Sequence, residues 1–223
     1  MRVLVKIWWS LIAPKDRRGI DYNYLFFISS FLKKFIYKFM IIHWTWNIWH
    51  WWVEKLISTY PWCDRTTLLK RDYSNWRIML DKFFWQIDRY FGYKRIELQK
   101  FLEFPCFKDQ TIIWWDVLKT WNIISSDDIF KMVLTKSEID LWLILTDVDG
   151  ILDKNWCIVS KISKNNLSKI NFWEKAGDVT GWMKAKVEKL LWLNKKIVIC
   201  NWKDFANISK WLNLWMWKWT VLT

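Results

Sequence analysis

The first string of the chain with residue types suited to chemistry on an anion lies near the N-terminus. Lys6 closes a short apolar run and is followed by Trp8, Trp9 and Ser10, and Lys15 comes nine residues after Lys6. A lysine at the end of a strand offers a point charge to a phosphate. Glycines in place of the two tryptophans would let backbone N–H groups surround phosphate oxygens. Read with glycines, the string predicts a phosphate-binding loop; Lys6 taken alone is better explained as a surface lysine before a loop.

A second string, His-Trp-Thr-Trp-Asn-Ile-Trp-His over residues 43–50, holds both histidines of the chain. It lies at a predicted junction between a strand and a helix, where glycines and a helix N-terminus together form an anion site. His50 falls on the first helical turn and could donate a hydrogen bond to a phosphate, whereas His43 ends the strand and is better explained as structural. The positions expected around a substrate phosphate are Trp44, Thr45, Trp46, Trp49 and His50.

Acidic residues follow a third apolar run in residues 146–150 (Thr-Asp-Val-Asp-Gly). Carboxylates such as Asp147 and Asp149 at the C-terminal end of a strand are placed to meet ligands in an open α/β sheet. The same five residues could equally form an ordinary Asp-Gly turn. Residues 125–128 (Ser-Ser-Asp-Asp) precede a helix, and an N-cap explains them even if Asp127 has a catalytic role.

A fourth string, residues 178–186 (Asp-Val-Thr-Gly-Trp-Met-Lys-Ala-Lys), contains Gly181 and opens another predicted helix. Asp178 or Thr180 would be its N-cap. Lys186 lies on the first turns of this helix, where it could reach an anion. A capped amphipathic helix with solvated lysines is the plainer interpretation.

The glycines that these loops require are missing, and tryptophans stand in their places. The chain has 23 Trp and 5 Gly, whereas about 16 glycines are typical of this length. Asn-Trp pairs at residues 75–76, 155–156 and 201–202 stand where Asn-Gly would be a strong turn signal. We hypothesise that most of these tryptophans are glycines encoded by UGA. The alternative is a genuinely Trp-rich surface that binds membranes or stacked bases.

The elements that must position these strings alternate between strands and helices. Strands are predicted at 3–7, 39–43, 141–146 and 197–200, and helices at 22–34, 48–58, 78–90, 127–134 and 183–191. Continuous apolar runs of strand length are typical of parallel strands covered on both faces. The alternation therefore predicts an α/β fold: a three-layer, open, mainly parallel sheet sandwiched by helices. We expect one domain over 1–223, with approximate lobes 1–138 and 139–223, and a small hairpin at 151–158.

Composition limits the class of protein and of partner. The net charge of +13 suits an anionic ligand such as a nucleotide, although part of it is explained by a bias toward AT-rich codons. Four widely spaced cysteines without a C-x-x-C pair argue against a zinc site and favour a reducing, cytoplasmic location. The N-terminal run is too short for a signal peptide, and lysines interrupt the apolar stretch 24–42. We therefore expect no membrane and no nucleic acid as partner.

Taken in order, the strings resemble the amino acid kinase superfamily, and within it the isopentenyl phosphate kinases. K-I-W-W-S with a second lysine resembles the K-x-G-G-S start of that family, and H-W-T-W-N-I-W-H resembles its H-G-G-G-S-F-G-H. I-S-S-D-D-I resembles S-G-D-D, T-D-V-D-G matches as it stands, and D-V-T-G-W-M-K-A-K-V resembles D-V-T-G-G-M-x-x-K-V. Thr45 and Ser126 replace family glycines, and the chain is short for the family around residues 60–105, the region that shapes the acceptor pocket.

The resemblance implies a phosphotransferase with the amino acid kinase, or carbamate kinase-like, fold. Its reaction would be ATP-dependent transfer of a phosphoryl group to isopentenyl phosphate, with Mg²⁺ bridging the nucleotide phosphates and no dedicated protein site for a metal. Residues 1–138 would bind the acceptor and residues 139–223 the nucleotide. The resemblance also allows the chain to form a homodimer. The implied catalytic residues are Lys6, Lys15, His50 and Asp127. The implied nucleotide-binding residues are Lys6, Trp8, Trp9, Ser10, Thr146, Asp147, Asp149, Gly181 and Lys186.

Three other functions remain open on the sequence. The same fold could phosphorylate a phosphonate, a nucleoside monophosphate or an amino-acid carboxylate, although His50 favours a phosphate or phosphonate. The chain could also be a non-catalytic nucleotide-binding domain. If the tryptophans are real, it could bind membranes or single-stranded nucleic acid.

Overall fold

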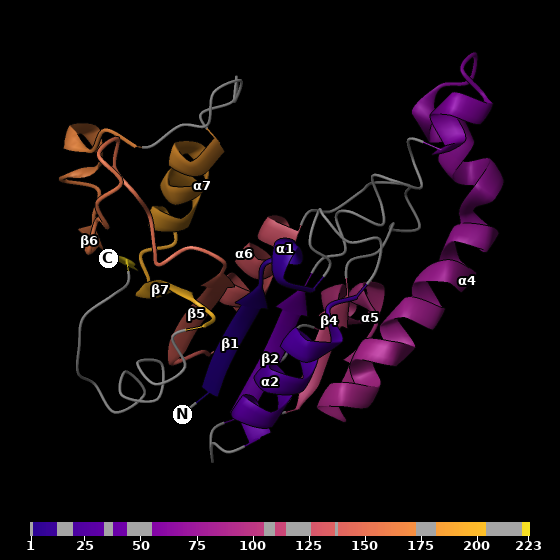
Figure 1. Ribbon diagram of the computed structural model, residues 1–223, viewed down its shortest axis with the longest axis horizontal. Helices are drawn as coiled ribbons and strands as arrows, with labels where there is room; N and C mark the ends of the chain where they lie inside the picture. Colours follow the sequence, from indigo (N-terminus) through magenta and orange to yellow (C-terminus); the bar gives the residue numbers. More distant parts are fainter. Residues whose placement is uncertain are drawn as a thin grey trace.

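A central sheet organises the chain. The computed structural model describes residues 2–12, 20–33, 38–43, 55–104, 110–114, 126–136, 138–172, 182–203 and 220–223. The strands are β1 (Arg2–Ile7), β2 (Lys38–His43), β3 (Lys94–Ile96), β4 (Thr111–Trp114), β5 (Leu141–Thr146), β6 (Lys161–Ile162), β7 (Ile197–Asn201) and β8 (Thr220–Leu222). Within these residues they form one eight-stranded sheet in the order β3-β4-β2-β1-β5-β7-β8-β6 (Figure 1).

The sheet is mainly parallel, as the sequence predicts. β1 pairs in parallel with β2 and β5, and the parallel pairing continues outward to β4 and β3 on one side and to β7 on the other. Only the end of the sheet beyond β7 reverses, because β8 runs antiparallel to β7 and β6 runs parallel to β8. The four predicted strands are all present, and their apolar side chains are buried.

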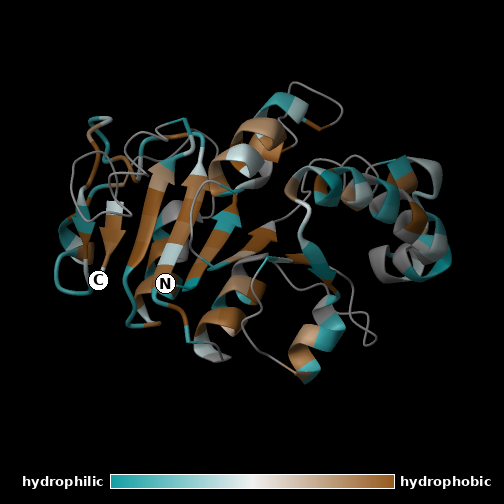
Figure 2. Cartoon of the chain, turned by 90° about the horizontal axis from the view of Figure 1, so that it is seen from below, coloured by the Kyte–Doolittle hydropathy of each residue, from teal (hydrophilic) through white to brown (hydrophobic). Residues whose placement is uncertain are grey.

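Helices cover both faces of the sheet, which confirms the predicted three-layer arrangement. Figure 2 shows the hydrophobic strands as a middle layer with helices above and below it. The helices are α1 (Trp9–Ile12), α2 (Tyr22–Lys33), α4 (Arg65–Phe91), α5 (Leu98–Glu103), α6 (Ser126–Lys136) and α7 (Trp182–Leu191), with a 3₁₀ turn η1 at Leu167–Lys169. α2 buries Leu25, Ile28 and Leu32 in the core.

Helix α4 is longer than predicted, and one predicted turn is wrong because of it. The helix begins at Arg65 rather than at 78, since the Asp64 carboxylate accepts the Thr67 backbone N–H at 3.0 Å and caps the first turn. The Asn75-Trp76 pair therefore lies inside the helix, where the Asn75 side chain donates to Asp72 Oδ1 at 2.8 Å. A local Asn-Trp signal was outweighed by a well-capped helix.

The predicted hairpin over 151–158 is confirmed. Leu152 and Ile158 form an antiparallel bridge, and the Trp156 N–H donates to the Asp153 carbonyl at 3.0 Å to close the turn. Among the described helices, none is both long and apolar enough to cross a membrane.

Candidate functional site

The C-terminal ends of the central strands meet at one edge of the sheet. Ile7 at the end of β1 stands level with His43 of β2 and Leu145 of β5, and Thr146 stands level with Asn201 of β7. Three of the strings singled out in the sequence begin at this edge, because Lys6, His43 and Thr146 lie at the C-terminal ends of β1, β2 and β5. An open parallel sheet places its ligands there.

Lys6 lies at this edge, and its side chain is almost fully buried. Only 3% of the residue is exposed. Its Nζ lies 5.4 Å from the centre of the Trp8 ring and 5.8 Å from that of Phe130, which α6 contributes. Two aromatic faces at these distances stabilise an ammonium that burial would otherwise disfavour. The charged side chain of Lys6 is therefore buried at the end of β1 and does not lie on the surface.

The segment after β1 turns directly into α1, as a phosphate loop would. The Trp8 N–H donates to the Leu145 carbonyl at 3.0 Å, and the Trp8 carbonyl accepts the Leu11 N–H at 3.1 Å. The Trp8 amide, expected to face a phosphate, is thus bonded to β5 in this structure. Trp9 and Ser10 form the first residues of α1. The indole of Trp8 occupies the space beside the Lys6 ammonium.

The acidic loop 146–150 is fixed by side chains at both ends. Thr146 Oγ1 accepts the Val148 N–H at 3.1 Å, and Asn201 Nδ2 donates to Asp149 Oδ1 at 2.8 Å. At the far end, Gly150 packs so tightly on β8 that a Cβ there would lie 2.8 Å from Thr220 Oγ1. Contacts at both ends therefore fix the conformation of this loop, so it is more than an isolated Asp-Gly turn.

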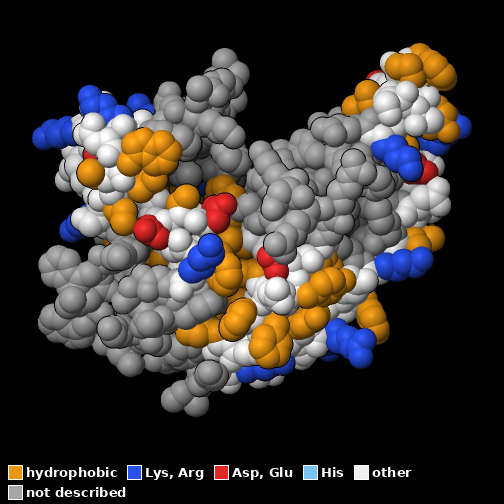
Figure 3. All heavy atoms as spheres, in the orientation of Figure 1, with side chains coloured by type: hydrophobic (Ala, Val, Ile, Leu, Met, Phe, Trp, Pro, Cys, Tyr) orange, Lys and Arg blue, Asp and Glu red, His pale blue; other side chains and the backbone are white. Residues whose placement is uncertain are grey.

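The carboxylates of this loop reach the surface. Asp147 and Asp149 are both exposed. On the face drawn in Figure 3, acidic side chains (red) gather near the middle, and most of the basic ones (blue) lie toward the periphery. Carboxylate oxygens are ligands of the kind that Mg²⁺ prefers. Among the described residues no three His, Cys, Asp or Glu side chains lie close enough to hold a metal ion by themselves.

Several predicted site residues lie outside the described residues or are described only in their backbone. Outside are Lys15, Trp44, Thr45, Trp46, Trp49, His50 and Gly181. Asp127 is the second residue of α6, at its N-terminal end as predicted, and Lys186 lies in the first half of α7. Of the predicted residues with described side chains, the structure brings Lys6, Thr146, Asp147 and Asp149 to the same sheet edge.

Two residues that support the acidic loop were missed in the sequence. The Asn201-Trp202 pair predicts only a turn, and the sequence indicates no role for Thr220. Asn201 stands at the end of a predicted strand, which is the available signal for it. No local pattern indicates Thr220, because its contact with Gly150 joins segments 70 residues apart.

Tyr24 is a buried packing residue of α2 that contacts Trp202, directly after the end of β7. Its ring meets that of Trp202 edge to face, with centres 4.6 Å apart. Burial raises the pKa of the Tyr24 hydroxyl well above its usual range, and electrostatic interactions with Cys200 and Asp21 add to this effect. The hydroxyl therefore stays protonated near neutral pH and is no candidate for a general base.

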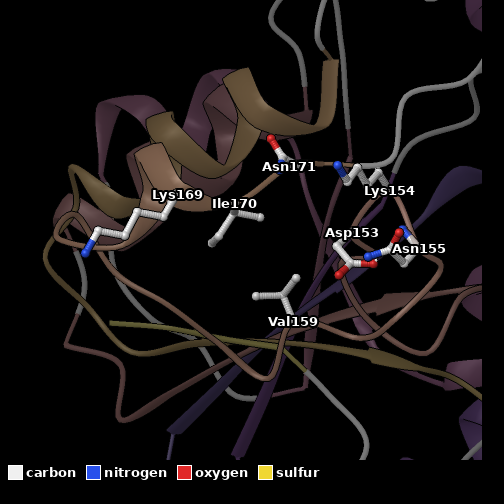
Figure 4. Close-up of a pocket in the computed structure, with 7 residues that line it drawn as sticks. All are labelled: Asp153, Lys154, Asn155, Val159, Lys169, Ile170 and Asn171. Atoms are coloured by element: carbon white, nitrogen blue, oxygen red, sulfur yellow. Dashed lines mark hydrogen bonds between the residues drawn. The ribbon is translucent and has the colours of Figure 1, made fainter.

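A pocket of about 250 Å³ lies beside the hairpin (Figure 4) and contains no predicted site residue. Its lining is Asp153, Lys154, Asn155, Val159, Lys169, Ile170 and Asn171. Asp153 Oδ1 already accepts the N–H groups of Asn155 and Cys157, at 2.8 and 2.9 Å. The carboxylate of this pocket thus stabilises the turn, so the pocket offers little chemistry of its own.

The hairpin turn provides evidence on whether tryptophans in this chain stand in place of glycines. Trp156 has φ +63° and is 63% exposed. This left-handed conformation is rare for a bulky residue, whereas glycine adopts it readily. Trp76 and Trp202, the tryptophans of the other two Asn-Trp pairs, are not among the described residues with positive φ. The backbone therefore supports glycine at 156 in particular.

We expect Trp156→Gly to raise the free energy of unfolding by about 1 kcal/mol, because a side chain in the left-handed region costs about 1–2 kcal/mol. Trp192→Gly is the control: Trp192 is 76% exposed, has no positive φ, and its ring lies 4.9 Å from Lys164 Nζ. That change should lower stability by roughly 1 kcal/mol. Urea denaturation measures both, and equal losses would count against glycine at 156.

Comparison with known proteins adds the following. No family model matches the chain. A segment of 73 residues is 42% identical to isopentenyl phosphate kinase of Methanocaldococcus jannaschii, covering 31% of the chain and 28% of that protein. The matched segment thus spans little more than a quarter of this curated relative.

Solved structures match over almost the whole chain. One isopentenyl phosphate kinase in a substrate complex has a TM-score of 0.64 at 16% identity, with 99% of both chains covered. Another isopentenyl phosphate kinase structure has a TM-score of 0.66 at 17% identity, with both chains fully covered. UMP kinase from Ureaplasma parvum has a TM-score of 0.60 at 17% identity, covering all of this chain and 98% of its own. At these identities the agreement concerns the fold.

Proposed function

We propose, on the premise that the chain has the amino acid kinase fold, that it transfers the γ-phosphoryl group of ATP to the phosphate of a small molecule. The acceptor that we propose is isopentenyl phosphate, and the product is isopentenyl diphosphate. The observation that carries the proposal is the buried Lys6 ammonium at the C-terminal edge of the sheet. The acidic loop 146–150, which Asn201 holds in place, leaves the sheet at the same edge. The 42% identity with an isopentenyl phosphate kinase supports this choice of acceptor.

The reaction requires positioning and charge neutralisation more than covalent help from the protein. An oxygen of the acceptor phosphate forms a bond to the γ-phosphorus, and the bond from that phosphorus to the bridging oxygen of ADP breaks. Negative charge spreads over the transferred group as this happens. Lys6 and Lys15 stabilise it, and Asp127 at the start of α6 orients the two lysines.

The acceptor is already an anion, so no strong general base is needed. His50 holds the acceptor phosphate by a hydrogen bond, and the backbone around Trp44 and Trp46 surrounds it when glycine occupies those positions.

The nucleotide belongs to the half of the chain after residue 138, and the acceptor to residues 1–138. Thr146, Asp147, Asp149, Gly181 and Lys186 lie on the nucleotide side. Mg²⁺, when bound, would supply positive charge that neutralises the nucleotide phosphates. The exposed carboxylates of Asp147 and Asp149 are the groups that can hold its hydration shell.

A panel of acceptors tests the proposal. It uses the glycine form, defined as the chain with glycine at Trp8, Trp9, Trp44, Trp46, Trp49, Trp182 and Trp219. With ATP and Mg²⁺, we expect the highest kcat/KM with isopentenyl phosphate, and weaker turnover of UMP, of a phosphonate and of an amino acid. UMP is included because a UMP kinase shares the fold. A higher kcat/KM with another acceptor would replace isopentenyl phosphate as the substrate.

A further inference from the structure

The side chain of Asn201 links the end of β7 to the acidic loop that follows β5. Its Nδ2 donates to Asp149 Oδ1 at 2.8 Å and lies 3.4 Å from the Asp147 carbonyl. Its Oδ1 accepts the backbone N–H of Lys203 at 2.9 Å. The backbone N–H of Trp202 also donates to the Thr146 carbonyl at 3.0 Å, so the two strand ends are joined at two levels.

The orientation of this amide follows from its partners. A backbone N–H can only donate, so the group of Asn201 that faces Lys203 must be the oxygen. The nitrogen then faces Asp149, whose carboxylate can only accept when ionised. Asparagine offers an acceptor toward position 203 and a donor toward position 149 from two separate atoms, whereas an ionised aspartate of the same size offers acceptors only.

We infer that Asn201 is a positioning residue for the nucleotide, acting through the carboxylate of Asp149. The inference rests on the proposed function, in which Asp149 faces the nucleotide. One Asp149 oxygen is committed to Asn201, which fixes the rotamer of the carboxylate and leaves the other oxygen for the nucleotide or its hydrated cation. Thr220 holds the opposite end of the loop by accepting the Ile151 N–H at 2.8 Å.

The inferred role requires an amide at position 201. A substitution that exchanges only the amide nitrogen for an oxygen can therefore test it. An aspartate at 201 could still accept the Lys203 N–H. Its other oxygen would face the Asp149 carboxylate at the distance where the amide now donates, and two carboxylates so close repel each other. The loop would then have to move Asp149 away.

The test compares Asn201→Asp with Asn166→Asp in the glycine form. Asn166 is a matched control because its side chain is also bonded at both ends, to the Ser163 N–H at 2.8 Å and the Lys161 carbonyl at 3.0 Å. We expect Asn201→Asp to raise the KM for ATP about tenfold, the order expected from losing a hydrogen bond to a charged group. The KM for isopentenyl phosphate should stay unchanged, and Asn166→Asp should affect thermal stability without moving the KM for ATP.

A second variant guards against a simple folding defect. Asn201→Ser replaces the amide with a shorter hydroxyl side chain without adding charge, and we expect it to raise the KM for ATP by less than the aspartate does, about threefold. Equal KM values for ATP in Asn201→Asp, Asn201→Ser and the parent would overturn the inference while leaving the kinase intact. A parent glycine form that neither binds ATP nor transfers phosphate would overturn the proposed function, and this inference with it.

Discussion

Lys6→Met in the glycine form should lower kcat for phosphoryl transfer by about a thousandfold, the scale on which such transition states depend on one well-placed cation. The side chain of Lys6 is charged and lies at the end of the central strand β1, where only 3% of the residue is exposed. Methionine is similar in length and apolar, so it can occupy the space between the β1 core and Phe130. We therefore expect the loss to appear in kcat, measured under saturating ATP and acceptor.

The control for this variant is Lys94→Met. Lys94 is also carried by a strand, but it is exposed on the edge strand β3 and pairs in register with Thr111, at the start of β4. The same chemical change there should leave kcat unchanged. A Lys6→Met enzyme that keeps its kcat would show that Lys6 does not act on the transferred group, and equal losses in both variants would indicate a general effect of charge.

Restoring glycine to the loops should have a comparably large effect on nucleotide binding. We expect the glycine form to bind ATP about a hundredfold more tightly than the literal Trp chain, which corresponds to about two hydrogen bonds to charged groups. The Trp8 ring lies 5.4 Å from Lys6 Nζ and so fills space beside the cation. An indole buries roughly 150–250 Å² and cannot fit where backbone has to touch phosphate. Calorimetry with ATP on both forms measures the difference.

Trp142 provides the contrasting case for the same comparison. It is 2% exposed in β5, its ring meets that of Phe130 with centres 6.4 Å apart, and its Nε1 lies 3.4 Å from the Ile139 carbonyl. Trp142→Gly in the glycine form should destabilise the fold by several kcal/mol, about 3–5 for loss of a large buried aromatic. Equal ATP affinity in the literal and glycine forms would contradict the glycine hypothesis for the phosphate loops.

The parts of the fold that were predictable are those decided by local sequence. β1, β2, β5 and β7 are continuous apolar runs because both of their faces are covered, so each could be recognised by itself. The short strands β3 and β8 could not, because three residues at or near the end of a sheet leave almost no pattern. The extra turns of α4 depend on the Asp64 cap, whereas the Asn75-Trp76 pair had predicted a turn within them.

The site was predictable to a similar degree and for the same reason. Lys6 and the loop 146–150 stand at the ends of recognisable strands, so the rule for parallel sheets placed them together. The burial of Lys6 against Phe130 and the bond from Asn201 to Asp149 depend on contacts between distant segments. Such contacts follow from the tertiary arrangement, which no local pattern contains.

The most direct test of the account is ³¹P NMR of the glycine form mixed with ATP, Mg²⁺ and isopentenyl phosphate. We predict that the monophosphate signal of isopentenyl phosphate disappears while the two coupled signals of its diphosphate and those of ADP grow in equal amounts. An unchanged monophosphate signal, with ATP intact or hydrolysed only to inorganic phosphate, would contradict transfer to a phosphate acceptor.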